Sequence, residues 1–317
     1  MRAAIAVLQG VVQAVGSQPG GPGGPGGSPP GFSTTKMLFE LLQFVGYFLA
    51  IGAVGFRFGI VRRVRGMSEE AKTILRPDNA AVIGMIGVIL LVLFTLGGPY
   101  IDSITHDKTF AASLPKNVAP FELKITMLVL AFVGFALVRA SASIGWTLAA
   151  IGVLIAVLQP LYTGKLASKV NAIHILAAST WLGTLLVLTM VGIRGVIRTN
   201  SAGVQRAQLV ADLVNSFSPL ALVASSIVVI TGLTTAWLHL KRLSSLWTTS
   251  YGMALDVKLV FVLIVILLGA WNWRRVRPSL GREGSEESIR RSATMELTFG
   301  AIVLIVTSGL VSLPSPK

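Results

Sequence analysis

The sequence predicts an all-α protein, a polytopic transmembrane helical bundle with about eight transmembrane helices. Hydrophobic residues make up 53% of the 317-residue chain, charged residues only 13%, and the mean hydropathy is +0.75. Soluble domains carry about twice that share of charge. Apolar runs of about 20 residues, enough to cross a bilayer as a helix, recur along the chain.

The first 35 residues are unlike the rest. Residues 1–16 hold one early arginine, a short apolar run and a small-residue ending, the pattern of a secretory signal peptide. Residues 17–35 are rich in glycine and proline and are expected to form a disordered linker, because they offer little apolar surface to bury. The transmembrane domain is predicted to cover residues 36–317.

Eight apolar segments divide this domain. They are residues 37–56, 80–99, 121–138, 145–162, 170–193, 217–240, 251–273 and 295–313. Pro99, Pro160 and Pro219 fall near predicted segment ends, where proline is best tolerated.

Charge predicts the orientation of the bundle. A net charge of +14 would suggest a nucleic-acid partner for a soluble protein, but in a membrane protein it reflects loop charge, so no nucleic acid is expected. Lysine and arginine are concentrated in residues 57–76 and 274–291, after the first and seventh segments. Both loops are therefore predicted to be cytoplasmic, with both termini outside the cytoplasm.

Tryptophan marks the expected membrane boundaries. Trp237 and Trp247 are predicted as interfacial anchors at the outer edge, and Trp146, Trp271 and Trp273 at the inner edge. Trp181 falls deep within the fifth segment, where it is expected to pack the bundle.

The fifth segment is the best functional clue. It contains His174, and a polar ring at membrane depth is costly unless it faces protein or water, so the ring is expected to point into the bundle. Ser179 and Gly183, four residues apart, offer a ledge on which a neighbouring helix can pack closely. A packing histidine that donates to a backbone carbonyl is the alternative interpretation of His174.

The predicted topology brings all three histidines, His106, His174 and His239, to the outer side. Met253 also lies at an outer end, and thioether with imidazole is a reasonable ligand set for Cu(I). The chain has no cysteine, which excludes thiolate sites and covalent c-type haem. For His106 and His239 the alternative is an ordinary histidine in a wet loop, and for Met253 a flexible filler.

Charges inside the apolar runs are candidates for coupling. Lys258 is expected either to extend to the membrane surface or to neutralise a carboxylate within the bundle. Glu296 opens the last segment, where a carboxylate at a helix N-terminus is favoured by the helix dipole. The motifs GxSxG, HExxH and GxxxxGK[ST] are absent from the sequence, so an enzyme is not expected.

Four ordered stretches resemble one family. They are HILAASTWLG (residues 174–183), SFSPLALVASSIVVITGL (216–233), YGMALDVK (251–258) and MELTFGAIVLIVTSGLVSLPSP (295–316). The matched pattern includes His174, Tyr251, Lys258 and Glu296. These stretches resemble the copper resistance protein D (CopD) family, with the strongest match over residues 170–317.

The resemblance implies copper transport, resistance or homeostasis at the cytoplasmic (inner) membrane of a bacterium. Copper ion and the lipid bilayer are the implied partners, with a periplasmic CopC-type copper-binding protein as a further one. The family often has Gly-His before the fifth-segment motif and an acidic residue three before its histidine, where this chain has Gly164-Lys165 and Asn171. Asn171 is expected to hydrogen-bond the ring of His174 and fix its tautomer.

Two other functions remain open from the sequence. One is a b-type haem membrane protein with His174 as axial ligand and Trp181 lining the porphyrin pocket. The other is a non-transporting partner of a cuproenzyme. A visible spectrum distinguishes the first, and co-purification the second.

Overall fold

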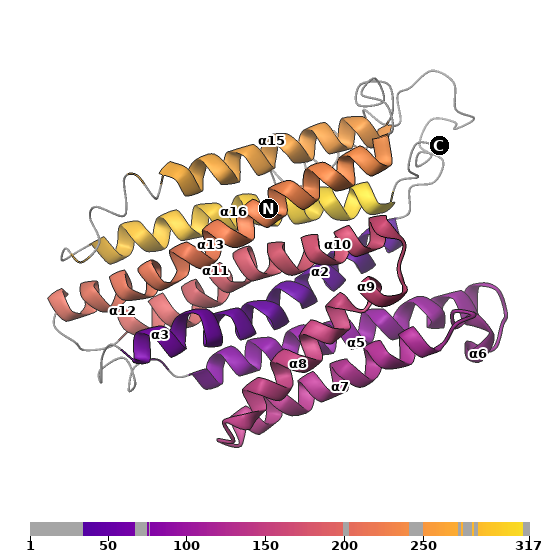
Figure 1. Ribbon diagram of the computed structural model, residues 1–317, viewed down its shortest axis with the longest axis horizontal. Helices are drawn as coiled ribbons and strands as arrows, with labels where there is room; N and C mark the ends of the chain where they lie inside the picture. Colours follow the sequence, from indigo (N-terminus) through magenta and orange to yellow (C-terminus); the bar gives the residue numbers. More distant parts are fainter. Residues whose placement is uncertain are drawn as a thin grey trace. The chain divides into compact units, whose positions relative to one another are not determined.

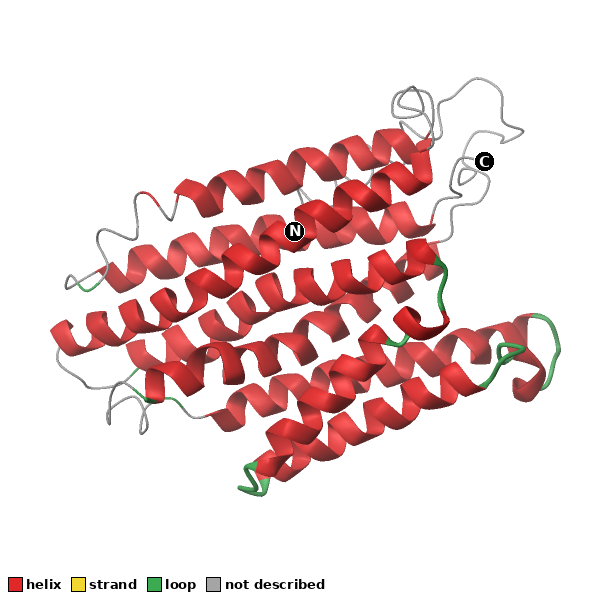
Figure 2. Ribbon diagram, viewed as in Figure 1, coloured by secondary structure: helices red, strands yellow, loops and turns green. Residues whose placement is uncertain are grey.

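Helices account for almost all of the described chain in the computed structural model (Figure 1). The structure describes residues 34–66, 75, 77–198, 203–240, 250–271, 274, 281 and 285–312. Within these residues there is no strand (Figure 2), so the predicted all-α fold class is confirmed. The predicted signal peptide and residues 17–33 of the predicted linker lie outside the described residues, and Thr34 and Thr35 begin the first helix.

The described parts of all eight predicted segments fall on helices. The main helices are α2 (Thr34–Gly55), α5 (Pro77–Thr105), α7 (Ala119–Arg139), α8 (Ile144–Leu158), α10 (Leu166–Ala178), α13 (Gly203–Leu240), α15 (Ser250–Trp271) and α16 (Ser285–Ser312). Among the described residues, seven helical stretches are long and apolar enough to span a membrane, and the 22-residue α15 is the remaining predicted helix. The chain is a multi-pass membrane protein.

Several helices extend beyond the predicted segments. Pro99 lies inside α5 and Pro219 inside α13, so the expectation that they mark helix ends is wrong. Proline is tolerated inside membrane helices because neighbouring groups satisfy the freed carbonyl. The helix α13 begins 14 residues before the predicted segment, at Gly203, in a polar stretch that still buries Ala207, Val210 and Leu213 at helical spacing.

Glu296 does not open its helix, and the capping interpretation is wrong. The helix α16 begins at Ser285, about three turns before Glu296. The preceding residues, SEESIRRSAT, are polar but strongly helix-compatible, so the helix continues past the apolar boundary. The carboxylate is buried, with 7% of the residue exposed.

The helices form two compact units. One comprises Leu42–Thr235 with Asn272–Thr294, and the other Ala236–Trp271 and Met295–Lys317 with the chain before Leu42. Within the first unit, α5 packs on α7 and α7 packs on α8.

Small residues bring α7 and α8 together. A Cβ on Gly134 would lie 2.7 Å from the carbonyl oxygen of Gly145, closer than real contacts allow. Next to this crossing the rings of Phe135 and Trp146 meet edge to face, with centroids 5.8 Å apart. Trp146 is only 4% exposed, so its prediction as an interfacial anchor is wrong: its ring completes the α7–α8 contact.

Two other predicted anchors are exposed on the helix surface. Trp237 in α13 is 73% exposed and Trp271 at the end of α15 is 59% exposed, as side chains facing lipid headgroups would be. Trp247 and Trp273 lie outside the described residues.

The fifth span is a continuous helix interrupted by two π-helical stretches. After α10 come η2 (Ser179–Gly183), α11 (Thr184–Val187), η3 (Leu188–Ile193) and α12 (Arg194–Ile197). A third π-helical stretch, η1 (Phe56–Val61), joins α2 to the short α3 (Arg62–Arg65). Such interruptions of the α-helical ladder are rare and often occur at functional sites.

Candidate functional site

The side chain of His174 contacts a second helix of the same unit. Its Nδ1 lies 2.9 Å from the hydroxyl oxygen of Thr231 in α13, in a partly buried position. This contact joins α10 to α13, both labelled in Figure 1. The ring therefore faces a neighbouring helix, and at Nδ1 its partner is a side-chain hydroxyl rather than the backbone carbonyl of the alternative interpretation.

The partner of Thr231 fixes the direction of this hydrogen bond. The Thr231 hydroxyl oxygen lies 2.6 Å from the carbonyl oxygen of Ile227. A carbonyl cannot donate, so the hydroxyl donates its one hydrogen to a backbone carbonyl, that of Ile227 or, 3.3 Å away, that of Val228. The Thr231 oxygen then accepts from His174, which places the ring hydrogen on Nδ1 and leaves Nε2 as the nitrogen that carries the lone pair.

Gly232 allows the ring to lie against α13. A Cβ at this position would lie 3.3 Å from Cε1 and 3.8 Å from Nδ1 of His174. The first distance is tighter than ordinary van der Waals contact, so a side chain here would press on the ring. Thr231 and Gly232 thus act together: one binds the imidazole and the other leaves room for it.

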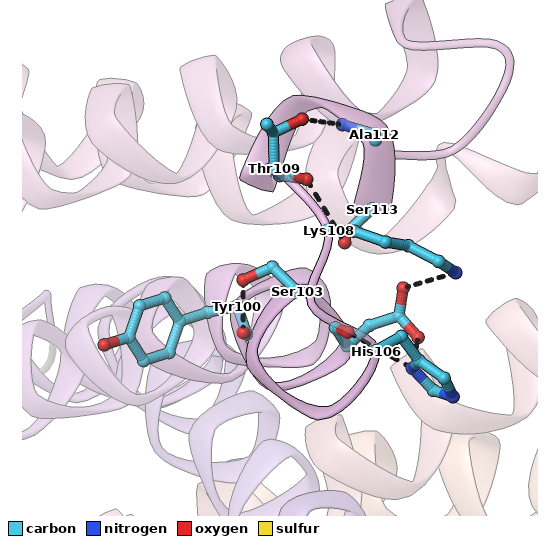
Figure 3. Close-up of polar contacts among 8 residues, drawn as sticks. Tyr100, Ser103, His106, Lys108, Thr109, Ala112 and Ser113 are labelled. Atoms are coloured by element: carbon cyan, nitrogen blue, oxygen red, sulfur yellow. Dashed lines mark hydrogen bonds and ion pairs between the residues drawn. The ribbon is translucent and has the colours of Figure 1, made fainter.

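His106 is exposed, whereas His174 is partly buried. It follows the end of α5, and its Nδ1 is 3.0 Å from a carboxylate oxygen of Asp102 (Figure 3). The ammonium of Lys108 lies 3.8 Å from the other oxygen of the same carboxylate. The structure therefore describes a solvated polar cluster at this helix end.

The structure also describes the positions of four other predicted site residues. Asn171 is exposed on α10, and Trp181 is buried in η2 with 8% of its surface accessible. Lys258 in α15 is half-buried, and Glu296 is buried in α16. The predicted roles of Asn171, Trp181 and Lys258, and the coupling role of Glu296, stay predictions.

Three predicted residues have no described side chain. His239 falls in the last turn of α13, and Tyr251 and Met253 in the first turn of α15. Among the residues whose side chains are described, no group of three or more His, Cys, Asp or Glu side chains gathers into a metal site.

The segment after His174 packs tightly on α2. A Cβ on Gly183 would overlap the carbonyl oxygen of Phe48, and one on Gly52 would overlap the backbone of Gly183. The close helix approach predicted at Gly183 is therefore confirmed, and α2 is the partner. Next to it, the indole of Trp181 belongs to the buried core.

Comparison with known proteins supports the sequence patterns. Residues 211–310 match the family model of copper resistance protein D. The matched region covers 100 of the 317 residues. That region includes Thr231 and Gly232, whereas His174 lies before it.

One relative of this chain is named as a copper protein. The copper transport protein CutJ of Bacillus subtilis (strain 168) is 29% identical over 144 residues, which cover 45% of this chain and 25% of the relative. The chain thus aligns with about a quarter of that relative's length. No solved structure matches the chain.

Thr231 is the residue that sequence reasoning missed. It stands in the TG pair of the stretch SFSPLALVASSIVVITGL, which resembles the family pattern, but nothing in the pattern says what the threonine binds. The contact joins residues 57 apart in sequence. The sequence did contain a signal for this contact. Two stretches resemble the family pattern, and one holds a histidine while the other holds a threonine hydroxyl that can donate and accept hydrogen bonds.

Proposed function

We propose that this chain is an integral membrane copper-handling protein that carries copper across the cytoplasmic membrane, with His174 as a metal ligand near the outer face. The CopD-family region and the name of the Bacillus subtilis relative support the copper part of this proposal. Copper is the cargo here, and the proposed function is transport rather than catalysis.

The bond between His174 and Thr231 is the observation that carries the proposal. A metal-binding histidine usually donates its other ring hydrogen to an acceptor, which fixes the tautomer and orients the ring. The 2.9 Å contact at Nδ1 is of this kind, and it supports Nε2 as the proposed ligating atom. An imidazole nitrogen, with thioether sulfur from methionine, suits Cu(I).

Further ligands must complete the site. The other candidates from the sequence are His239, Met253 and His106, and a periplasmic CopC-type protein is a candidate copper donor. Asp256, Lys258 and Glu296 are the charges that coupling to a gradient would use, since no nucleotide-binding motif occurs in the sequence.

The test compares copper accumulation in cells that express the unaltered protein and the variant His174→Ala. We expect the expressed protein to change cellular copper and the variant to leave it at the level of cells without the protein. Equal accumulation with both forms, at equal membrane abundance, contradicts the proposal. A Soret band in the purified protein would instead favour a b-type haem protein.

A further inference from the structure

Two buried hydroxyls on the fifth span lie apart from the copper chemistry. Ser179 and Thr184 are both fully buried, with 0% of each residue exposed. Neither the Ser179 Oγ nor the Thr184 Oγ1 has a hydrogen-bond partner within the described residues. A buried hydroxyl without a partner is costly, and more so inside a membrane, where solvent cannot replace the missing bond.

Other hydroxyls in these helices avoid that cost. Thr189, five residues further along the same span, donates to the carbonyl of Leu185 at 2.8 Å. Ser218 in α13 does the same with the carbonyl of Val214 at 2.9 Å. This backward bond is the usual solution for serine and threonine inside a helix. Ser179 and Thr184 lack this bond to a backbone carbonyl, although Thr189 on the same span makes it.

The π-helical turn explains why the two hydroxyls belong together. Ser179 is the first residue of η2, and Thr184 directly follows the last residue of η2, five positions after Ser179. The wider π-helical turn brings residues five apart nearer to one face of the helix than an α-helical turn does. In a regular α-helix the same spacing would turn them to different faces.

The same turn breaks the regular backbone ladder. The amide of Thr184 bonds to the carbonyl of Trp181, three residues earlier, instead of keeping to the four-residue spacing of an α-helix. Breaks of this kind often occur where a side chain or a water molecule enters the ladder.

This face of the span lies beside α2. The hydroxyl of Thr184 occupies the space that a Cβ on Gly55 would fill, and Gly183 meets the backbone of Phe48. The missing side chain of Gly55 on α2 therefore leaves room for the Thr184 hydroxyl between α2 and the fifth span. The crossing is sealed from solvent, as the full burial of both hydroxyls requires.

The chemistry of the two groups selects the ligand. Each hydroxyl can donate one hydrogen bond and accept others, and neither carries charge. Soft Cu(I) prefers sulfur and imidazole, so this pair does not suit the cargo. A single water molecule needs two to four polar partners and fits a pair of hydroxyls beside an interrupted helix.

We propose that Ser179 and Thr184 together hold one buried water molecule at the π-helical turn, against α2. The water completes the hydrogen bonding of both hydroxyls and stabilises the bulged helix. This site is independent of the proposed copper function, because it uses neither His174 nor a metal.

A double-mutant cycle on the purified full-length protein in detergent tests the proposal. The variants are Ser179→Ala, Thr184→Val and the double variant, and the readout is the midpoint of thermal unfolding. Each single change releases the shared water, so we expect the midpoint to fall by roughly 2–4 °C. The double variant should fall no further than the lower of the two single variants.

A matched control is Thr189→Val, which removes a hydroxyl bonded within its own helix. Its effect should add to that of Ser179→Ala. Single variants with an unchanged or raised midpoint would show that the hydroxyls hold nothing, and additive losses would show that they share nothing. Either result overturns the proposal.

If a variant fails to fold, a high-resolution map of the unsubstituted protein decides the question. A density peak within hydrogen-bonding distance of both hydroxyls supports the site. A map that resolves both side chains without such a peak overturns it.

Discussion

The ring of His174 in α10 donates through Nδ1 to the hydroxyl of Thr231 in α13, 2.9 Å away. The threonine in turn donates to the carbonyl of Ile227 at 2.6 Å, so the chain of hydrogen bonds runs from the ring into the backbone of a second helix. Two stretches that resemble the CopD family pattern thereby meet in space. This relationship gives the proposed ligand a defined tautomer and a fixed orientation.

Replacing Thr231 with valine should weaken copper binding without unfolding the protein. Valine keeps the shape of threonine but removes the oxygen that accepts from Nδ1, so the ring loses its orientation. We expect the affinity for Cu(I) to fall by about 10-fold, the lower end of the range for groups that orient a metal ligand. Competition with a chromogenic Cu(I) chelator measures the change.

Thr234→Val is the matched control for this variant. The Thr234 hydroxyl is exposed and bonds to the carbonyl of Ile230 at 2.9 Å, on the same helix. Its removal should leave copper affinity unchanged, and Thr231→Ser should retain most of the affinity because it keeps the hydroxyl. Equal losses in the two valine variants would mean that Thr231 does not act through His174.

Alanine at position 232 should disturb the ring by contact rather than by loss of a hydrogen bond. Its Cβ would lie 3.3 Å from Cε1 of His174, so the ring must shift by a few tenths of an ångström. We expect Gly232→Ala to lower Cu(I) affinity in the same chelator competition. Gly195→Ala is the control, because a Cβ there meets nothing within 4 Å.

The helices were predictable because a membrane helix needs only a long apolar run, and hydropathy detects such runs. The helix ends were not. At the start of α13 the chain becomes polar while Ala207 and Val210 remain buried against protein, and an average over hydropathy misses that one-sided pattern. The prediction that Glu296 opens the last helix failed in the same way, because α16 begins in the polar residues that precede Glu296.

The candidate site was only half predictable. A histidine inside an apolar run stands out because burying a polar ring is costly, and this identified His174. Its partner did not stand out, since threonine is common in membrane helices and usually bonds to its own backbone. Nothing local in sequence says that Thr231, 57 residues away, also accepts from an imidazole.

His106 should contribute far less to copper handling than His174. It sits on an exposed cluster in which Asp102 already binds its Nδ1 at 3.0 Å, and exposed polar contacts of this kind contribute little to stability. We expect His106→Ala to change the free energy of unfolding by less than about 0.5 kcal/mol. Copper accumulation should remain close to that of the unaltered protein.

The measurement is cellular copper, with His174→Ala beside His106→Ala at equal membrane abundance. A loss of accumulation as large in His106→Ala as in His174→Ala would contradict this prediction. It would make the loop after α5 a necessary ligand or entry point, and the site would then have to extend to the end of α5.

The contact between the fifth span and α2 should be sensitive to a single methyl group. Because a Cβ on Gly183 would overlap the carbonyl oxygen of Phe48, the variant Gly183→Ala must push the two backbones apart. Overpacking of a close contact costs about 1–3 kcal/mol, so thermal unfolding in detergent should begin at a lower temperature.

Gly195→Ala on the same span provides the comparison, since its Cβ meets nothing within 4 Å and alanine is the better helix former. That variant should be as stable as the unaltered protein or slightly more stable. Both variants replace glycine with alanine on the same span, but only position 183 lies in a close helix contact. The difference between the unfolding midpoints of the two variants therefore isolates the effect of that contact. Equal midpoints would mean that α2 and the fifth span do not approach at Gly183 as closely as the structure has them.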